Sequence, residues 1–87
     1  MNDPMERVEA ERNRQVEKWG PDHDPGNGVL LAVLIEEVGE VGRALCEHWP
    51  APYRDHELEA ELVQVAAVAV QWLETIKRRR ESDPFSE

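Results

Sequence analysis

Residues 57–72 read ELEAELVQVAAVAVQW, and this stretch decides the fold class. Between Leu62 and Val70 it holds eight apolar residues and a single polar one, Gln64. Apolar and polar residues do not alternate here as they would in a half-buried strand, so the pattern predicts a helix. This helix is apolar nearly all round, whereas a surface helix of a monomer needs only one apolar stripe. We therefore expect it to be buried on two sides.

Two breaks divide the chain into three expected helices. The first break, GPDHDPGNG, carries two prolines and three glycines in nine residues, and the second reads WPAPYRD. A helix cannot continue through such segments. Nothing in the chain reads as strand, so the expected fold class is all-α. We expect one domain over residues 1–87, with helices over roughly residues 3–19, 29–48 and 55–80.

Residues near the expected helix ends support these bounds. Asp3 can cap the first helix, and Pro4 suits its first position. The first helix should end at Gly20, which Pro21 follows. Asp55 is the expected cap of the third helix. The apolar stripe of the first helix is thin, so we expect that helix to pack outside the other two.

Composition limits where the protein works and what it binds. The net charge of −9 argues against a nucleic-acid polymer as partner, because binding its phosphates requires a basic surface. No apolar run approaches the roughly 18–20 residues of a membrane span, and the charged N-terminal segment has no signal-peptide pattern. The single cysteine, Cys46, fits a reducing compartment. These features predict a cytoplasmic protein that does not bind a membrane.

The small size of the chain predicts oligomerisation. A domain of this length buries only about 60 % of the surface that its unfolded chain exposes, so its own core is marginal. Aromatic residues make up only 6 % of the 87 residues. We therefore expect a helical bundle that is completed in a homodimer or homotetramer.

The second expected helix combines an apolar face with a polar pair on its flank. With Val38 directed inward and about 100° per residue, Leu30 and Ala44 extend the apolar surface to one side only. Glu37 lies in the middle of that extension, and Glu40 follows one turn later. The expected core face comprises Leu31, Leu34, Ile35, Val38, Val41, Gly42 and Leu45.

The third expected helix repeats this layout. With Leu62 directed inward, Val68 and Trp72 extend the apolar surface to one side. Glu61 lies within the extension, and Gln64 follows one turn later. The expected core face comprises Leu58, Leu62, Val65, Ala66, Ala69, Leu73 and Ile76.

Packing these helices side by side would bring the two polar pairs together, in a site made of Glu37, Glu40, Glu61 and Gln64. Three carboxylates beside an apolar face repel one another and lose hydration unless a cation joins them. Oxygen donors of this kind suit Mg²⁺, with Mn²⁺ as a possible equivalent. Gln64 would be a neutral ligand or a hydrogen-bond donor that orients a carboxylate. Alternatively, the glutamates are solvated, as expected for Glu36, and Gln64 pairs with a backbone carbonyl or with its symmetry mate.

Three ordered segments carry a family resemblance. RQVEKWG (14–20), VLIEEVGEVGRAL (33–45) and ELVQVAAVAVQWLE (61–74) resemble the MazG-like, all-α nucleoside triphosphate pyrophosphohydrolases. The resemblance implies a helical fold that assembles as dimers or tetramers. It also implies hydrolysis of a nucleoside triphosphate to a monophosphate and pyrophosphate, with Mg²⁺ held by an ExxE pair on one helix and an ExxD pair on another.

The resemblance also implies roles for individual residues. The ExxE pair falls on Glu37 and Glu40, and either could accept the proton of the attacking water. The acid of the second pair falls on Glu61. Gln64 occupies the position where the family has Asp, which removes one negative charge and one strong ligand. We expect this departure to weaken Mg²⁺ binding.

Cations near two helix ends could contact the outer phosphates of a substrate. Lys77 and Arg78 end the third helix, and Arg14 and Lys18 are weaker candidates on the first. The alternative for Lys77 and Arg78 is a favourable interaction with the negative end of the helix dipole.

Aromatic residues and a loop histidine are the remaining candidates. Trp19 could stack on a base and His23 could touch a phosphate, although packing and solvation are their alternative roles. Trp49 and Trp72 are expected to be packing residues. A second class of function also stays open: a catalytically silent helical oligomer of the same ancestry that binds nucleotides or a protein partner.

Overall fold

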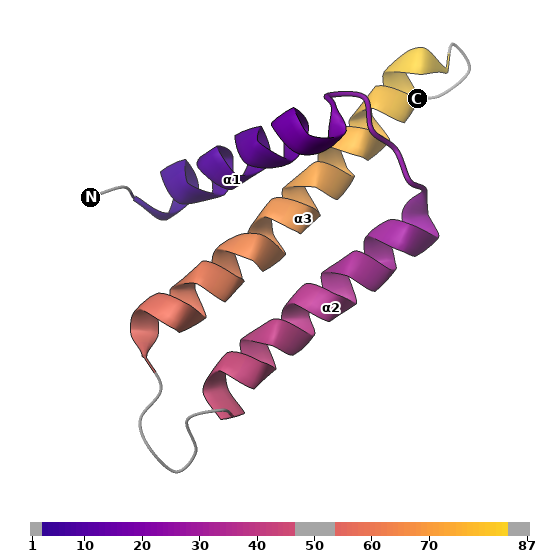
Figure 1. Cartoon of the computed structure of the whole chain (residues 1–87). Helices are drawn as coiled ribbons and strands as arrows, with labels where there is room; N and C mark the ends of the chain where they lie inside the picture. The colour runs from indigo at the N-terminus through magenta and orange to yellow at the C-terminus, as the bar shows by residue number, and fades with distance from the viewer. Residues whose placement is uncertain (1–2, 47–53, 84–87) are drawn as a thin grey trace.

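The computed structural model describes residues 3–46 and 54–83, and every regular element in this part of the chain is an α-helix (Figure 1). The expected all-α class is confirmed. The expected helix bounds are met to within two residues wherever both lie in the described chain; the expected end at His48 lies outside it. The helices are α1 (Pro4–Trp19), α2 (Asn27–Cys46) and α3 (Asp55–Ser82).

The start and end of α1 follow from local chemistry. The Asp3 side chain accepts hydrogen bonds from the backbone N–H groups of Met5 and Glu6, at 2.8 and 3.1 Å, and Pro4 is the first helical residue. Two of the four N–H groups that a helix start leaves unpaired are thereby satisfied. The helix ends at Gly20, whose φ of 92° suits a residue without a Cβ. Both ends were predicted correctly.

The start of α3 corrects one expectation. Asp55 was expected to cap this helix, but it is the first helical residue, and Arg54 occupies the cap position without a side-chain hydrogen bond. Asp55 still suits its place, because a negative charge in the first turn interacts favourably with the positive end of the helix dipole.

The central element is α3, which packs against both α1 and α2 (Figure 1). It runs antiparallel to α2, while α1 crosses it, and the described parts of α1 and α2 make no direct packing contact. Two ion pairs, Arg7 with Glu59 and Arg12 with Glu74, connect α1 to α3. The third helix has neighbours on two sides, but the expected burial on two sides is met only in part, because Leu62 and Leu73 are exposed in the single chain.

The buried core within the single chain is small. Leu30 of α2 is 1 % exposed, and Val8 of α1 and Ala67 and Val68 of α3 are buried as well. The hydroxyl of the fully buried Thr75 donates to the carbonyl oxygen of Gln71 at 2.8 Å, so its burial leaves no unpaired polar group.

The expected core faces of α2 and α3 are not buried in the single chain, and the prediction of their burial is wrong at this level. Ile35 is 61 % exposed and Leu73 is 67 % exposed. The chain instead buries the flanking edges that carry Leu30 and Val68. Each helix has apolar surface wider than one neighbour covers, and hydrophobic periodicity gives the width of that surface but not which part meets the neighbour. The same exposed faces include Leu31, Val38, Leu45, Leu62 and Ile76.

The exposed apolar stripes of α2 and α3 lie away from α1. On α3, the buried Ala67 and Thr75 lie about 140° from Leu62 around the helix axis, counting about 100° per residue. On α2, Glu37 lies about 100° from Val38 in the same way. No helix in the described chain is both long enough and apolar enough to cross a membrane.

Candidate functional site

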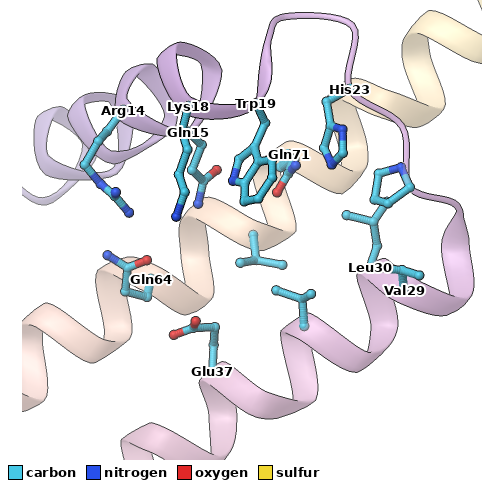
Figure 2. A pocket seen from close by; sticks show the side chains of 13 residues that line it. Arg14, Gln15, Lys18, Trp19, His23, Val29, Leu30, Glu37, Gln64 and Gln71 are labelled. Carbon is cyan, nitrogen blue, oxygen red and sulfur yellow. The ribbon is translucent and has the colours of Figure 1, made fainter.

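A cavity of about 370 Å³ opens between α1, α2 and α3 (Figure 2). It exists because α1 and α2 both rest on α3 without contacting each other. Its walls combine carboxylate, amide, cationic, aromatic and aliphatic side chains. The lining residues are Arg14, Gln15, Lys18, Trp19, His23, Pro25, Val29, Leu30, Val33, Glu37, Gln64, Val68 and Gln71.

Glu37 is the carboxylate in the lining of this cavity, and the neutral amide of Gln64 lines it as well. They enter it from α2 and α3, as the matched flanks of the two helices predicted (Figure 2). Burial raises the pKa of Glu37, and the negative charge of Glu61 raises it further. Glu36 and Glu40 act in the same direction, although none of Glu36, Glu40 and Glu61 lines the cavity. Glu37 is therefore an electronegative centre with neighbours of like charge on both helices.

A further acidic residue, Glu11 of α1, belongs to this cluster. The hydrogen bond from Arg14 lowers the pKa of Glu11, burial opposes that shift, and a hydrogen bond from the amide of Gln64 lowers the pKa again. The Arg14 Nε lies 2.9 and 3.0 Å from the two Glu11 carboxylate oxygens. The amide of Gln64 therefore acts on a carboxylate of α1, whereas the sequence interpretation expected it to orient a carboxylate of the predicted metal site.

No pattern in the sequence identified Glu11. It lies on α1, whose apolar stripe is thin, and its only local signal is the i,i+3 spacing to Arg14. Contact with Gln64 joins residues 53 positions apart, which periodicity within one helix does not report. An aspartate at position 64 would face the Glu11 carboxylate, whereas the amide of Gln64 donates to it.

The opposite wall is cationic and aromatic. Arg14 and Lys18 extend from α1 toward Gln64 and Glu37 (Figure 2). Trp19 stacks on His23 with ring centroids 5.4 Å apart and planes inclined by 21°. The ammonium group of Lys18 lies 5.0 Å from the Trp19 ring centroid, in cation–π range. The site therefore holds negative charge on one side and positive charge beside a flat apolar surface on the other.

Two amide side chains complete the cavity. Gln15 is almost fully buried, and its Oε1 accepts a hydrogen bond from Arg12 Nη1 at 2.7 Å. Gln71 lies on α3 between the two walls (Figure 2). Both residues are polar side chains on the edges of their helices. Only the packing of α1 on α3 shows that these two edges meet at one cavity.

Lys77 and Arg78 lie outside this cavity. Arg78 Nη2 donates to the backbone carbonyl of His23 at 3.1 Å and to Thr75 Oγ1 at 3.2 Å. Lys77 is exposed and lies 3.9 Å from Glu81. Arg78 supports the loop that carries His23, and phosphate contact by either cation stays a prediction. The packing role expected for Trp49 falls outside the described residues.

The chemistry of the acidic cluster fits Mg²⁺, although the side chains are not gathered into a complete coordination site. Among residues 3–46 and 54–83, no three acidic, histidine or cysteine side chains lie close enough together to hold a metal ion. The donors are hard oxygens on facing helices, and the pKa of Glu37 is raised first by burial and then by neighbouring carboxylates, whose negative charge a cation would offset. Binding would require the glutamate side chains to change rotamer and converge.

Comparison with known proteins adds no relative: no family model matches the chain, and neither a curated protein nor a solved structure matches it.

Proposed function

We propose that this protein is a Mg²⁺-dependent nucleoside triphosphate pyrophosphohydrolase that releases a nucleoside monophosphate and pyrophosphate. The observation that carries the proposal is one cavity in which Glu37 and Gln64 face Arg14, Lys18 and Trp19. A nucleoside triphosphate has a polyanion at one end and a flat base at the other, and these two walls offer complementary groups for both. The resemblance of three ordered segments to MazG-like enzymes points the same way.

The acidic wall would hold the metal ion. Glu37, Glu40 and Glu61 are the proposed ligands, and Gln64 keeps the Glu11 carboxylate in place through its hydrogen bond. When bound, Mg²⁺ would supply positive charge shared between these carboxylates and the phosphate oxygens and would make a bound water more acidic. Mn²⁺ offers a similar preference for oxygen ligands.

The remaining residues would orient the substrate and move one proton. Arg14 and Lys18 bind the outer phosphates, and the face of Trp19 receives the base. Water forms a bond to the α-phosphorus while the bond to the bridging oxygen of the leaving pyrophosphate breaks. Glu37 accepts the proton of this water, with Glu40 as the alternative base; of the two, Glu37 is the one that lines the cavity.

The exposed apolar faces of α2 and α3 favour assembly of the enzyme as a homodimer or homotetramer. Ile35, Val38 and Leu73 are all more than half exposed in the single chain. Exposed apolar side chains on two neighbouring helices suit pairing with a second copy, which would turn two helices into a four-helix core. A cytoplasmic location fits the single unpaired Cys46.

The activity is tested with a panel of ribo- and deoxyribonucleoside triphosphates assayed for pyrophosphate release in the presence of Mg²⁺. At least one nucleotide is expected to be hydrolysed by the wild type, and Glu37→Ala is expected to reduce kcat by about 100-fold or more. Glu36→Gln is the matched control, because Glu36 is adjacent in sequence but exposed and outside the cavity. Absence of pyrophosphate release from every nucleotide would refute the enzymatic proposal.

The runner-up is a catalytically silent helical oligomer that binds nucleotides or a protein partner. It is favoured by the glutamine at position 64 and by the dispersed donors of the acidic cluster. Metal binding distinguishes the two proposals. The enzyme requires that millimolar Mg²⁺ or Mn²⁺ raise the melting temperature and that Glu61→Gln abolish the increase, whereas the silent oligomer predicts no response to either ion.

A further inference from the structure

The loop between α1 and α2 is held by the C-terminal part of α3. Asp24 receives two hydrogen bonds from Arg79, from Nε at 2.8 Å and from Nη2 at 2.7 Å. The carboxylate of Asp24 also accepts from the backbone N–H of Gly26 at 2.9 Å, and Gly26 has a φ of 94° that favours glycine. One ion pair therefore fixes both the position of the loop and its internal turn.

Further contacts extend this attachment in both directions along the chain. Arg79 Nη1 donates to Asn27 Oδ1 at 2.6 Å, and Trp72 Nε1 donates to the same oxygen at 3.0 Å. Arg78 Nη2 donates to the backbone carbonyl of His23 at 3.1 Å. Two consecutive arginines of α3 thus hold the loop and the first residue of α2. Isolated exposed ion pairs contribute little, but bidentate pairs within a network impose a defined geometry.

This loop forms one end of the cavity. His23 and Pro25 line the cavity directly, and Trp19, against which His23 stacks, is the residue where α1 ends. Because the described parts of α1 and α2 do not contact each other, their packing does not determine where the loop lies. The hydrogen bonds from Arg78 and Arg79 of α3 determine the position of the loop instead.

We propose that the Asp24–Arg79 pair is a positioning latch that holds His23 against Trp19 and so sets the aromatic wall that receives the nucleotide base. The stacked pair itself is independent of the proposed function; its role in base binding rests on that function. The Arg79 hydrogen bonds lower the pKa of Asp24 to about 2, so the latch stays ionised throughout the neutral and mildly acidic range.

The first test measures the stack without any ligand. In wild-type protein the ring protons of His23, assigned with a His23→Gln variant, are expected to be shifted upfield in the NMR spectrum by the ring current of Trp19. Asp24→Ala is expected to remove most of this shift, and Arg79→Ala likewise. Asp22→Ala is the matched control, because Asp22 lies two residues away in the same loop and has no part in the latch. Far-UV circular dichroism checks that each variant keeps its helices.

Rescue separates positioning from a general loss of structure. Asp24→Glu keeps the charge and is expected to retain part of the ring-current shift, and the Asp24→Ala/Arg79→Ala double variant should lose no more of it than either single variant. If Asp24→Ala leaves the His23 signals unchanged, the latch is refuted, whatever the enzyme assay shows. If any single variant does not fold, Arg79→Lys, which removes the bidentate geometry only, takes its place.

The second test measures the consequence for substrate binding. With the nucleotide that the wild type hydrolyses best, Asp24→Ala is expected to raise KM about tenfold and to leave kcat within about twofold, because base positioning contributes binding in ground and transition states alike. Loss of the ring-current shift without a change in KM would refute the positioning role. A wild type that hydrolyses no nucleotide would refute the proposed function, while the NMR measurement still decides on the latch.

Discussion

Glu37 is the residue on which the proposed site depends, and its surroundings make the ionised form of its side chain unfavourable. It is partly buried, and the pKa of Glu37 is raised by this burial and by the neighbouring charge of Glu61. An acid with a raised pKa binds its proton more tightly in the folded chain than in the unfolded one. The contribution of Glu37 to the free energy of unfolding is therefore greatest at pH values below 4.5, the ordinary pKa of a glutamate. This contribution is lost as the pH rises through the pKa that Glu37 has in the folded chain.

Glu37→Gln is accordingly expected to raise the melting temperature at pH 7 in the presence of EDTA, by about 2–5 °C. The neutral amide removes the desolvation and repulsion that the ionised carboxylate bears. Thermal melts at pH 7 and pH 5 check the reason as well as the direction, since the gain should shrink at the lower pH. Glu9→Gln is the control, at an exposed position of α1 whose charge does not raise the pKa of Glu37. A Glu37→Gln variant that melts below the wild type at pH 7 would contradict the argument.

Gln64 is a neutral residue, whereas an acidic residue at position 64 would place a second carboxylate near that of Glu11. Gln64→Glu is expected to lower the melting temperature without divalent cations by roughly 5 °C, because it replaces a hydrogen bond by repulsion. The same variant should gain more from millimolar Mg²⁺ than the wild type does, since it adds an oxygen donor of the preferred kind. Gln71→Glu, in the same cavity, controls for the added charge; equal Mg²⁺ responses in both variants would argue against a role specific to position 64.

At the level of helices, α1 is attached to α3 mainly by a few long side chains. Arg12 donates from Nε to Glu74 Oε1 at 2.7 Å and from Nη1 to Gln15 Oε1 at 2.7 Å. Its side chain is 11 % exposed although it carries a charge. Arg12 therefore joins the buried amide of α1 to the surface of α3, and the cationic wall of the cavity depends on this attachment.

Arg12→Ala is expected to destabilise the protein by about 1–2 kcal/mol, or several degrees in melting temperature, because it removes two charge-assisted hydrogen bonds and the packing of the side-chain stem. Arg7→Ala should cost clearly less, since Arg7 and its partner Glu59 are both more exposed. Chemical denaturation of both variants measures the difference. Equal losses of free energy of unfolding in the two variants would show that the partly buried network around Arg12 stabilises the protein no more than the exposed Arg7–Glu59 pair does.

At the level of the whole molecule, the single chain leaves much of its apolar surface uncovered. The stripes on α2 and α3 face away from α1, and their side chains Ile35, Val38 and Leu73 are more than half exposed. A chain of this size has little core of its own, so burying these stripes against a second copy would add the apolar area that it lacks.

Ile35→Glu is expected to convert the wild-type oligomer into a monomer that remains helical, because Ile35 contributes little to the core of the single chain. Sedimentation equilibrium at micromolar concentration measures the change, and the melting temperature of the wild type should rise with protein concentration. Met5→Glu is the control, since Met5 is equally apolar and 71 % exposed but lies on α1. A wild type that is monomeric at these concentrations would contradict the expected assembly.

The sequence by itself determined the three helices and the identity of two residues that face each other. Asp3, Pro4 and Gly20 set the ends of α1 through local hydrogen bonding and backbone preference, which act between residues close in the chain. Regular spacing placed Glu37 and Gln64 on matching flanks, because about 100° of rotation per residue fixes which side chains share a face.

Only the tertiary structure decided which apolar edges meet and which partners the polar residues find. The chain buries the edges of Leu30 and Val68 and leaves the faces of Val38 and Leu62 exposed, although periodicity favoured the reverse. Glu11 as the partner of Gln64 and Arg79 as the partner of Asp24 join residues more than 50 positions apart. A periodic pattern describes one helix at a time, whereas these contacts depend on how three helices are placed relative to one another.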